Sequence, residues 1–177
     1  MGDQLKNRTA LVTGANRGIG LAIAREFAQQ GAEVFLAGRN TAELEKVRAA
    51  IAAAGGKAQV CTVDLEKEES VRAAAAWLKG KLQSLDVFIG NAASLGARLP
   101  LIRYPLDTWR QSFRINIVSP GPTRTEMRAR AAPEEDPMSI KAPDKIVGLF
   151  VRLATPACTL QGQWIDADEW LAGKAKV

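Results

Sequence analysis

The chain has 177 residues, 24 of them Lys or Arg and 19 Asp or Glu, which gives a formal net charge of +5. It contains no histidine, so imidazole-based catalytic triads and histidine-containing zinc sites are excluded. The basic residues are scattered among acidic ones instead of forming the runs that would indicate nucleic-acid binding. We therefore expect one domain over residues 1–177, no metal site, no nucleic-acid partner and a modest attraction for phosphate-bearing small ligands.

Two further features bear on the compartment. The cysteines, Cys61 and Cys158, lie far apart in apolar or mixed segments, which predicts reduced thiols and not a disulfide framework. The sequence has no apolar run of about 18 residues and no charged-then-apolar leader before Leu11, so neither a membrane span nor a signal peptide is expected. The expectation is a soluble, cytoplasmic protein with no membrane partner.

The first half of the chain alternates between strand-like and helix-like segments. Short apolar runs predict four strands, at 9–13, 33–37, 58–63 and 85–89. Three segments with helical periodicity separate them: the first ends at Gly31, the second is capped by Asn40 with Glu43, and Gly55 ends it. Because parallel strands need helical crossovers, this alternation predicts a doubly wound parallel α/β sheet.

The third helix shows a charge gradient as well as a periodicity. Its first turn is expected to carry three glutamates and its last turn two lysines, which suits the helix dipole. These are Glu66, Glu68, Glu69, Lys79 and Lys81. The helical period turns four apolar side chains inward. These are Val71, Ala74, Leu78 and Leu82.

The second half is less regular. Residues 115–118 resemble a strand that runs into Ser119-Pro120-Gly121, and 163–166 a final strand. The proline-rich stretch 128–142 predicts a surface loop or lid, and 145–153 resumes a helical pattern.

A glycine-rich loop follows the first predicted strand and opens the first predicted helix. Gly14, Gly18 and Gly20 allow a tight turn and a close approach of backbone to ligand, while the N–H groups at the helix start favour an anion. The alternative is a strand-to-helix turn without a ligand. Three glycines so close together would then weaken the helix without any gain in packing, so we favour anion binding.

Four motifs in this order resemble the short-chain dehydrogenase/reductase family. They are Thr13-Gly14-x-x-x-Gly18-Ile19-Gly20, Asp64-Leu65, Asn91-Ala92-Ala93 and Ser119-Pro120-Gly121. The resemblance covers nearly the whole chain and implies a Rossmann-type sheet that is truncated between strands four and six. It implies an oxidoreductase that transfers hydride between a nicotinamide dinucleotide and a small-molecule carbonyl or alcohol.

Cofactor contacts carry over from the family position by position. Those of the glycine loop are Gly14, Asn16, Arg17, Gly18, Ile19 and Gly20; the later ones are Asp64, Leu65, Asn91, Ala92, Ala93, Pro120, Gly121 and Thr125. Asp64 would face the adenine. The Asn91 segment departs from the family's Asn-Asn-Ala-Gly, because Gly90 replaces the first Asn and Ala93 the Gly.

The choice of dinucleotide depends on charge. An NAD site usually has a carboxylate at the end of strand two, whereas a 2′-phosphate needs a cation there. Strand two here ends in Ala37-Gly38-Arg39, and Arg17 lies in the glycine loop. Two guanidinium groups favour NADP(H) over NAD(H), although Arg39 alone could equally be an ordinary surface residue.

The family's catalytic Ser and Tyr-x-x-x-Lys are absent from this sequence. Its only tyrosine is Tyr104, and Thr108 stands where the lysine would follow. About two βα units are lacking between strand four and Ser119. Residues 109–121 look like a junction of two family segments: 109–116 resembles the start of the helix after strand four, and 114–121 resembles the strand that enters the Ser-Pro-Gly loop. If its segment is helical, Asn116 corresponds to the family's active-site Asn. If its segment is a strand, Asn116 is structural. The β-branched residues beside it favour the strand, and we expect 114–118 to pair beside strand four.

Two interpretations therefore stay open. One is an NADP(H)-dependent oxidoreductase whose working form contains a segment that this sequence lacks. The other is a non-catalytic dinucleotide-binding remnant. An interaction module with an empty loop is a third, less favoured interpretation. The sequence names no substrate and leaves open whether the chain forms a homo-oligomer.

Overall fold

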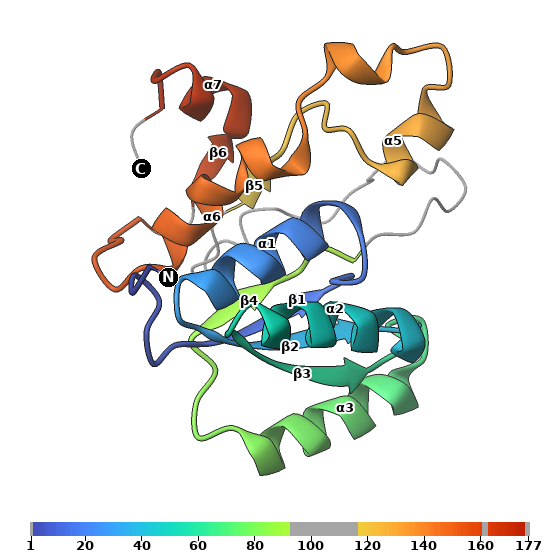
Figure 1. The fold of residues 1–177 in the computed structure, drawn as a ribbon, viewed down its shortest axis with the longest axis vertical. Coiled ribbons are helices and arrows are strands. Elements are labelled where there is room, and N and C mark those ends of the chain that lie inside the picture. The colour runs from blue at the N-terminus through green and yellow to red at the C-terminus, as the bar shows by residue number, and fades with distance from the viewer. Residues whose placement is uncertain (1, 93–116, 161–162, 176–177) are drawn as a thin grey trace. The chain divides into compact units, whose positions relative to one another are not determined.

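The computed structural model describes residues 2–92, 117–160 and 163–175 (Figure 1). The chain divides into two compact units, Met1–Ala93 and Ser94–Val177. Each unit is described separately below.

The first unit is built on a four-stranded parallel sheet. Its strands are β1 (Thr9–Thr13), β2 (Glu33–Gly38), β3 (Lys57–Thr62) and β4 (Val87–Ile89), in the spatial order β3-β2-β1-β4. The predicted parallel α/β sheet is thereby confirmed, with strand boundaries within two residues of those expected.

Three helices connect these strands. They are α1 (Gly18–Gln29), α2 (Thr41–Ala53) and α3 (Glu68–Lys81). Helices α1 and α2 cover one face of the sheet and α3 covers the other (Figure 1). The predicted helix ends are confirmed: the Glu43 N–H donates to Asn40 Oδ1 at 3.2 Å, and Gly31, just after α1, has φ +91°.

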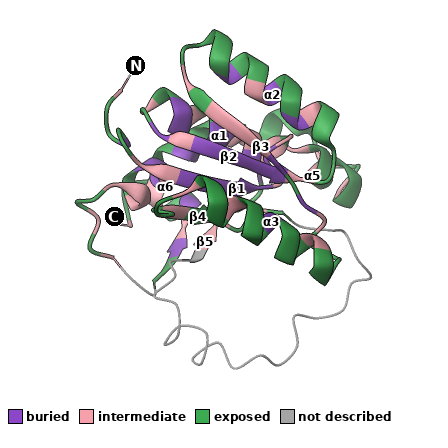
Figure 2. Ribbon diagram, turned by 90° about the horizontal axis from the view of Figure 1, so that it is seen from below, coloured by how far each residue is buried: buried purple, intermediate pink, exposed green. Residues whose placement is uncertain are grey.

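The core of this unit surrounds the two central strands, whose side chains are buried on both faces of the sheet. Strands β1 and β2 are buried along most of their length (Figure 2). On the α3 face, Leu11, Phe35 and Cys61 form a buried cluster with Ala74 of α3. Leu78 and Leu82 pack against this cluster as expected. The two central strands, β1 and β2, therefore form the buried centre of the sheet.

Two details of α3 differ from the sequence prediction. Glu66 precedes the helix, which begins at Glu68, and Val71 is 38% exposed. Instead the Trp77 ring packs edge-on against Phe35, with ring centroids 6.0 Å apart. The Trp77 ring of α3 thus contacts the sheet at Phe35, whereas Val71 is left exposed.

The second unit contains a small parallel pair of strands and several short helices. Strand β5 (Ile117–Ser119) pairs with β6 (Trp164–Asp166). The helical segments are α5 (Glu126–Ala131), α6 (Val147–Ala154) and α7 (Ala167–Leu171), with 3-10 turns at Pro137–Ser139 and Pro143–Lys145. The strand at 163–166 and the helix at 145–153 are confirmed, with small shifts in their ends.

One prediction for this region was wrong, and another holds only in part. The described residues of 114–118 pair with β6 in a separate sheet and not beside β4, because 164–166 offers an in-register parallel partner. The expected loop at 128–142 begins as the end of α5, where Thr125 caps the helix and Pro133 comes only after its last residue. Asn116, Tyr104 and the segment around them lie outside the described residues.

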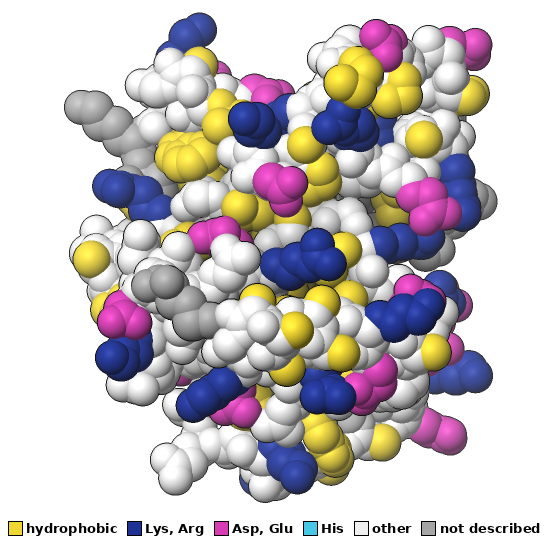
Figure 3. Space-filling view, in the orientation of Figure 1, with side chains coloured by type: hydrophobic (Ala, Val, Ile, Leu, Met, Phe, Trp, Pro, Cys, Tyr) yellow, Lys and Arg dark blue, Asp and Glu magenta, His cyan; other side chains and the backbone are white. Residues whose placement is uncertain are grey.

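The surface fits the scattered charges of the sequence. On the face seen in Figure 3, Lys and Arg side chains are dispersed among acidic and uncharged ones. Within the described ranges 2–92, 117–160 and 163–175, none of the helices has the length and apolar character required to span a bilayer. Both cysteines are free thiols, and burial raises the pKa of Cys61.

Candidate functional site

The ends of β1 and β4 meet where the strand order of the first sheet reverses. Strand β1 has β2 on one side and β4 on the other, and all three run parallel. In open parallel sheets, ligands bind beyond the carboxyl ends of the strands at this switch point. The residues that follow β1 and β4 therefore form the candidate site.

Thr13 and Asn91 tie these two strand ends together. The Thr13 hydroxyl donates to the Ile89 carbonyl at 3.2 Å and accepts the N–H groups of Asn91 and Ala92, both at 2.9 Å. The Asn91 side-chain amide donates to the Thr13 carbonyl at 2.9 Å and to the Gly14 carbonyl at 3.4 Å. Thr13 is only 5% exposed, so its polar atoms need these partners. The resulting network fixes the start of the glycine loop.

The glycines of the loop are required by its geometry. Gly14 and Gly18 have φ values of +65° and +57°, in the left-handed region that side chains disfavour. A Cβ on Gly14 would lie 2.9 Å from the Asn91 amide nitrogen. A Cβ on Gly20 would overlap the Gly14 carbonyl oxygen and lie 2.5 Å from the same Asn91 nitrogen. The loop is thus packed backbone against backbone, a form that only glycine allows.

Helix α1 begins inside this loop. Its N-cap residue, Arg17, has extended backbone and makes no capping hydrogen bond with its side chain. The N–H groups of the first helical turn have no intrahelical partner, and the positive end of the helix dipole is directed to the same point. Asn16, Gly18 and Ile19 are half-buried around it. Such a cradle is suited to a phosphate group.

Strands β2 and β3 end beside each other at the same edge. Gly38 is in register with Thr62, and the Val63 N–H donates to the Gly38 carbonyl at 2.9 Å. Arg39 follows β2, and its side chain is 64% exposed. Asp64 follows β3 in a turn where its N–H donates to the Ser70 hydroxyl at 2.9 Å. The Arg39 guanidinium therefore follows the end of β2, and the Asp64 carboxylate follows the end of β3.

These features fit a dinucleotide. The backbone cradle at Gly14–Gly20 matches a pyrophosphate, because any Cβ at Gly14 or Gly20 would meet neighbouring backbone or the Asn91 amide. Arg39 is an exposed cation at the end of β2, paired with Glu66 at 3.7 Å, and its guanidinium could bind a further phosphate. The half-buried Asp64 lies at the end of the next strand.

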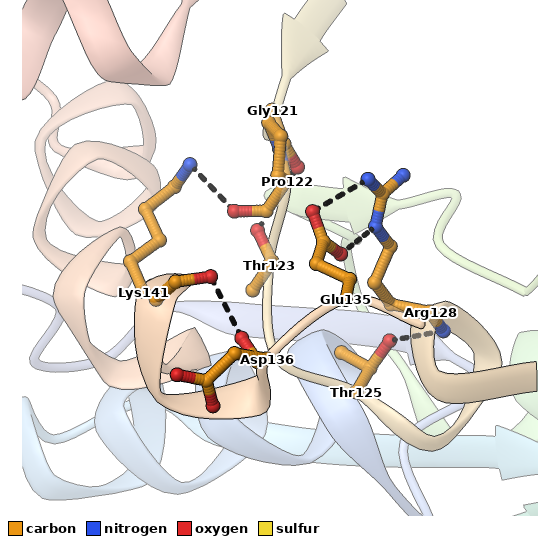
Figure 4. Close-up of polar contacts among 9 residues, drawn as sticks. Gly121, Pro122, Thr123, Thr125, Arg128, Glu135, Asp136 and Lys141 are labelled. Atoms are coloured by element: carbon orange, nitrogen blue, oxygen red, sulfur yellow. Dashed lines mark hydrogen bonds and ion pairs between the residues drawn. The ribbon is translucent and has the colours of Figure 1, made fainter. Parts of the chain in front are cut away.

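In the second unit, the loop after β5 is held by its own polar contacts. The buried Thr123 hydroxyl donates to the carbonyls of Pro120 and Gly121, at 3.2 and 3.1 Å. Lys141 Nζ donates to the Pro122 carbonyl at 3.0 Å (Figure 4) and forms an ion pair with Asp168 at 2.5 Å. This loop is therefore fixed in conformation from two sides.

Thr125 ends that loop and begins α5. Its hydroxyl accepts the Arg128 N–H at 3.2 Å. The Arg128 guanidinium in turn binds both carboxylate oxygens of Glu135, at 2.7 and 2.9 Å (Figure 4). These hydrogen bonds lower the pKa of Glu135 and raise that of Arg128. The pair anchors α5 to the segment that follows it.

The sequence-derived site residues fall into three groups. Those that surround the strand ends of the first unit are Gly14, Asn16, Arg17, Gly18, Ile19, Gly20, Arg39, Asp64, Leu65, Asn91 and Ala92. Leu65 is 49% exposed there. Pro120, Gly121 and Thr125 belong to the loop of the second unit. Ala93 and Asn116 lie outside the described residues.

Three residues that organise these loops are not among the sequence-derived site residues. Thr13 belongs to the first motif, and a hydroxyl at the end of a buried strand is a signal that could have marked it. Thr123 binds carbonyls only two and three residues before it, within the same loop. Lys141 gives no comparable signal, because the Pro122 carbonyl that it binds lies 19 positions earlier and only the folded chain brings the two together.

Comparison with known proteins agrees with this geometry. The short chain dehydrogenase family model matches residues 8–121. Gluconate 5-dehydrogenase of Gluconobacter oxydans is 34% identical over 113 residues, which are 64% of this chain and 44% of that protein. The matched part therefore spans less than half of that relative's length.

Solved structures give the same result. A putative short chain dehydrogenase from Shigella flexneri 2a, complexed with NADP, has a TM-score of 0.83 and 26% identity; the match covers 95% of this chain and 100% of that one. One from Escherichia coli CFT073, complexed with NADPH, has a TM-score of 0.82 and 26% identity, covering 93% and 98%. This chain therefore belongs to the short-chain dehydrogenase/reductase family.

Proposed function

We propose that this chain binds NADP(H). We further propose that a form of the protein that also contains the catalytic segment lacking here transfers hydride between NADP(H) and a small-molecule carbonyl or alcohol. The observation that carries the proposal is the close-packed glycine loop, in which Gly14 and Gly20 leave no space for a Cβ beside Asn91. The family membership and the NADP and NADPH complexes of two similar structures support it.

Each group of candidate site residues has a defined task in this proposal. The loop Gly14–Gly20, including Asn16, Arg17 and Ile19, binds the pyrophosphate through backbone N–H groups at the start of α1. Asp64, Leu65 and the Asn91–Ala93 segment orient the adenosine and support the strand ends. Pro120, Gly121 and Thr125 are proposed contacts to the nicotinamide and phosphates on the family resemblance. When bound, the nicotinamide supplies or accepts the hydride.

Preference for NADP(H) depends on Arg39 and Arg17. The end of β2 carries a guanidinium where an NAD site would carry a carboxylate. A guanidinium can donate two parallel hydrogen bonds to a 2′-phosphate. NADH lacks that phosphate and gains nothing from Arg39.

Proton transfer is the step for which the chain offers no family residue. The family uses a tyrosine whose pKa an adjacent lysine lowers, and this sequence contains no Tyr-x-x-x-Lys. Asn116 remains the one proposed active-site residue. We expect this chain on its own to bind NADP(H) without turnover, the behaviour of a non-catalytic dinucleotide-binding protein.

Fluorescence titration of NADPH and NADH into protein of verified mass tests the proposal. We expect saturable NADPH binding that Arg39→Ala or Arg17→Ala weakens about tenfold or more, since a hydrogen bond to a charged group contributes about 1.5–3 kcal/mol. Arg48→Ala is the matched control, because Arg48 is an α2 surface residue that pairs with Glu45 at 2.5 Å. Absence of NADPH binding would overturn the proposal, and carbonyl reduction by the same sample would overturn the expectation of a non-catalytic chain.

A further inference from the structure

An acidic side chain faces Arg39 at the end of β2. Glu66 Oε1 lies 3.7 Å from Arg39 Nη1, and the two side chains are 65% and 64% exposed. The contact arises from the sheet register, because Gly38 and Thr62 are paired and the segments that follow β2 and β3 leave the sheet side by side.

The backbone turn after β3 holds Glu66 at this point. Asp64 Oδ1 accepts the Glu66 N–H at 3.2 Å, and the Asp64 carbonyl accepts the Lys67 N–H at 3.1 Å. The Lys67 ammonium pairs with Asp64, at 3.9 Å. Glu66 is the carboxylate that the described structure pairs with Arg39.

We propose that Glu66 weakens the preference of the site for NADP(H): its carboxylate competes with the 2′-phosphate of NADP(H) for Arg39. This inference rests on the proposed function, and it adds a residue that weakens the binding of NADP(H). Binding of the phosphate requires Arg39 to leave Glu66 or to share its charge with it, and the phosphate must also approach a like charge. NAD(H) has a neutral ribose hydroxyl at this position, so Glu66 leaves its affinity unchanged.

The magnitude follows from the exposure of the pair. Exposed ion pairs between such side chains contribute little, and loss of the competing partner should tighten NADPH binding by about twofold to fivefold. Salt screens exposed charges, so the gain should shrink as the ionic strength rises.

The test compares Glu66→Gln with wild type for NADPH, NADH and adenosine 2′,5′-bisphosphate, the last as a fragment without nicotinamide. Glu68→Gln is the matched control: it removes the same charge two residues away, from a side chain that pairs with Arg72 within α3. Arg39→Ala and the double variant Arg39→Ala/Glu66→Gln complete a cycle. Dissociation constants come from cofactor fluorescence and from competition by the fragment.

We expect Glu66→Gln to bind NADPH and the fragment about twofold to fivefold more tightly, with NADH unchanged and the gain absent in the Arg39→Ala background. Unchanged NADPH affinity, an equal change for NADH, or a gain that survives in Arg39→Ala would overturn the inference while leaving the proposed function intact. Failure of wild type to bind NADPH would instead overturn the proposed function, and the inference with it.

Discussion

The two compact units of this chain are stabilised in different ways. In the first, two buried central strands lie between helices, and the fully buried side chains include Phe27, Phe35 and Leu36. In the second, the described strands have three residues each, and hydrogen bonds and ion pairs fix the loops between short helices. Apolar burial thus dominates the first unit, whereas the second unit combines a smaller apolar core, which includes the fully buried Ile146 and Leu149, with polar contacts that fix its loops.

The largest expected effect concerns the glycine loop of the first unit. Gly20→Ala should lower the free energy of unfolding by about 1–3 kcal/mol, because the new Cβ overlaps the Gly14 carbonyl oxygen. It should also abolish NADPH binding. Gly80→Ala is the control: Gly80 is helical, has open space around it, and should gain up to about 1 kcal/mol. Urea denaturation and cofactor titration measure both, and an equally tolerated Gly20→Ala would contradict the close-packed loop.

An intermediate effect is expected for the polar contacts of the second unit. Lys141→Met removes the ammonium that binds Pro122 and Asp168, and should cost about 1.5 kcal/mol of unfolding free energy. Lys145→Met, at an exposed position four residues on, should cost nearly nothing. Amide hydrogen exchange of residues 117–125 would report the change locally. Equal exchange in the two variants would mean that the loop is held by something other than Lys141.

The smallest effect is a pH dependence in the first unit. Asp86 accepts the Thr9 N–H at 2.9 Å and pairs with Arg8 at 2.6 Å, which lowers the pKa of Asp86, the Thr9 hydrogen bond being the larger cause. A lowered folded-state pKa stabilises the fold above the unfolded pKa of about 3.9 and loses that stabilisation as the pH falls below it.

Asp86→Asn should therefore cost about 1 kcal/mol near neutral pH, and the difference from wild type should shrink below about pH 4. Denaturation of both proteins over this pH range measures it. A difference that is constant across the range would show that the Asp86 charge does not matter. Asp3→Asn, at a side chain 73% exposed, is the control and should show little difference at any pH.

Much of the first unit is predictable from the sequence. Short apolar runs mark the strands, Gly31 and Asn40 mark helix ends, and the order of strands and helices predicts a parallel sheet. The site at its strand ends follows from the glycines of residues 14–20, because glycines at this spacing between a strand and a helix are typical of a phosphate-binding turn. Asp64 and Arg39 follow from their positions after strands.

The second unit is predicted less well for a physical reason. Short strands carry little periodicity, and a strand such as β5 can pair wherever a complementary backbone lies in register. Sequence alone does not show that 164–166 is its partner. Likewise the prolines of 128–142 favour a loop over the whole stretch, whereas the capping by Thr125 and the charge pattern of α5 extend a helix into its start.

The α/β class, the family and the glycine loop are readable from the sequence alone, since each depends on local motifs or local periodicity and on their order along the chain. Four contacts emerge only in the folded chain: Thr13 with Asn91, Glu66 with Arg39, Lys141 with Pro122, and Lys141 with Asp168. They link residues separated by between 19 and 78 positions. Strand register and side-chain packing bring such residues together, and the local periodicity of a sequence predicts neither.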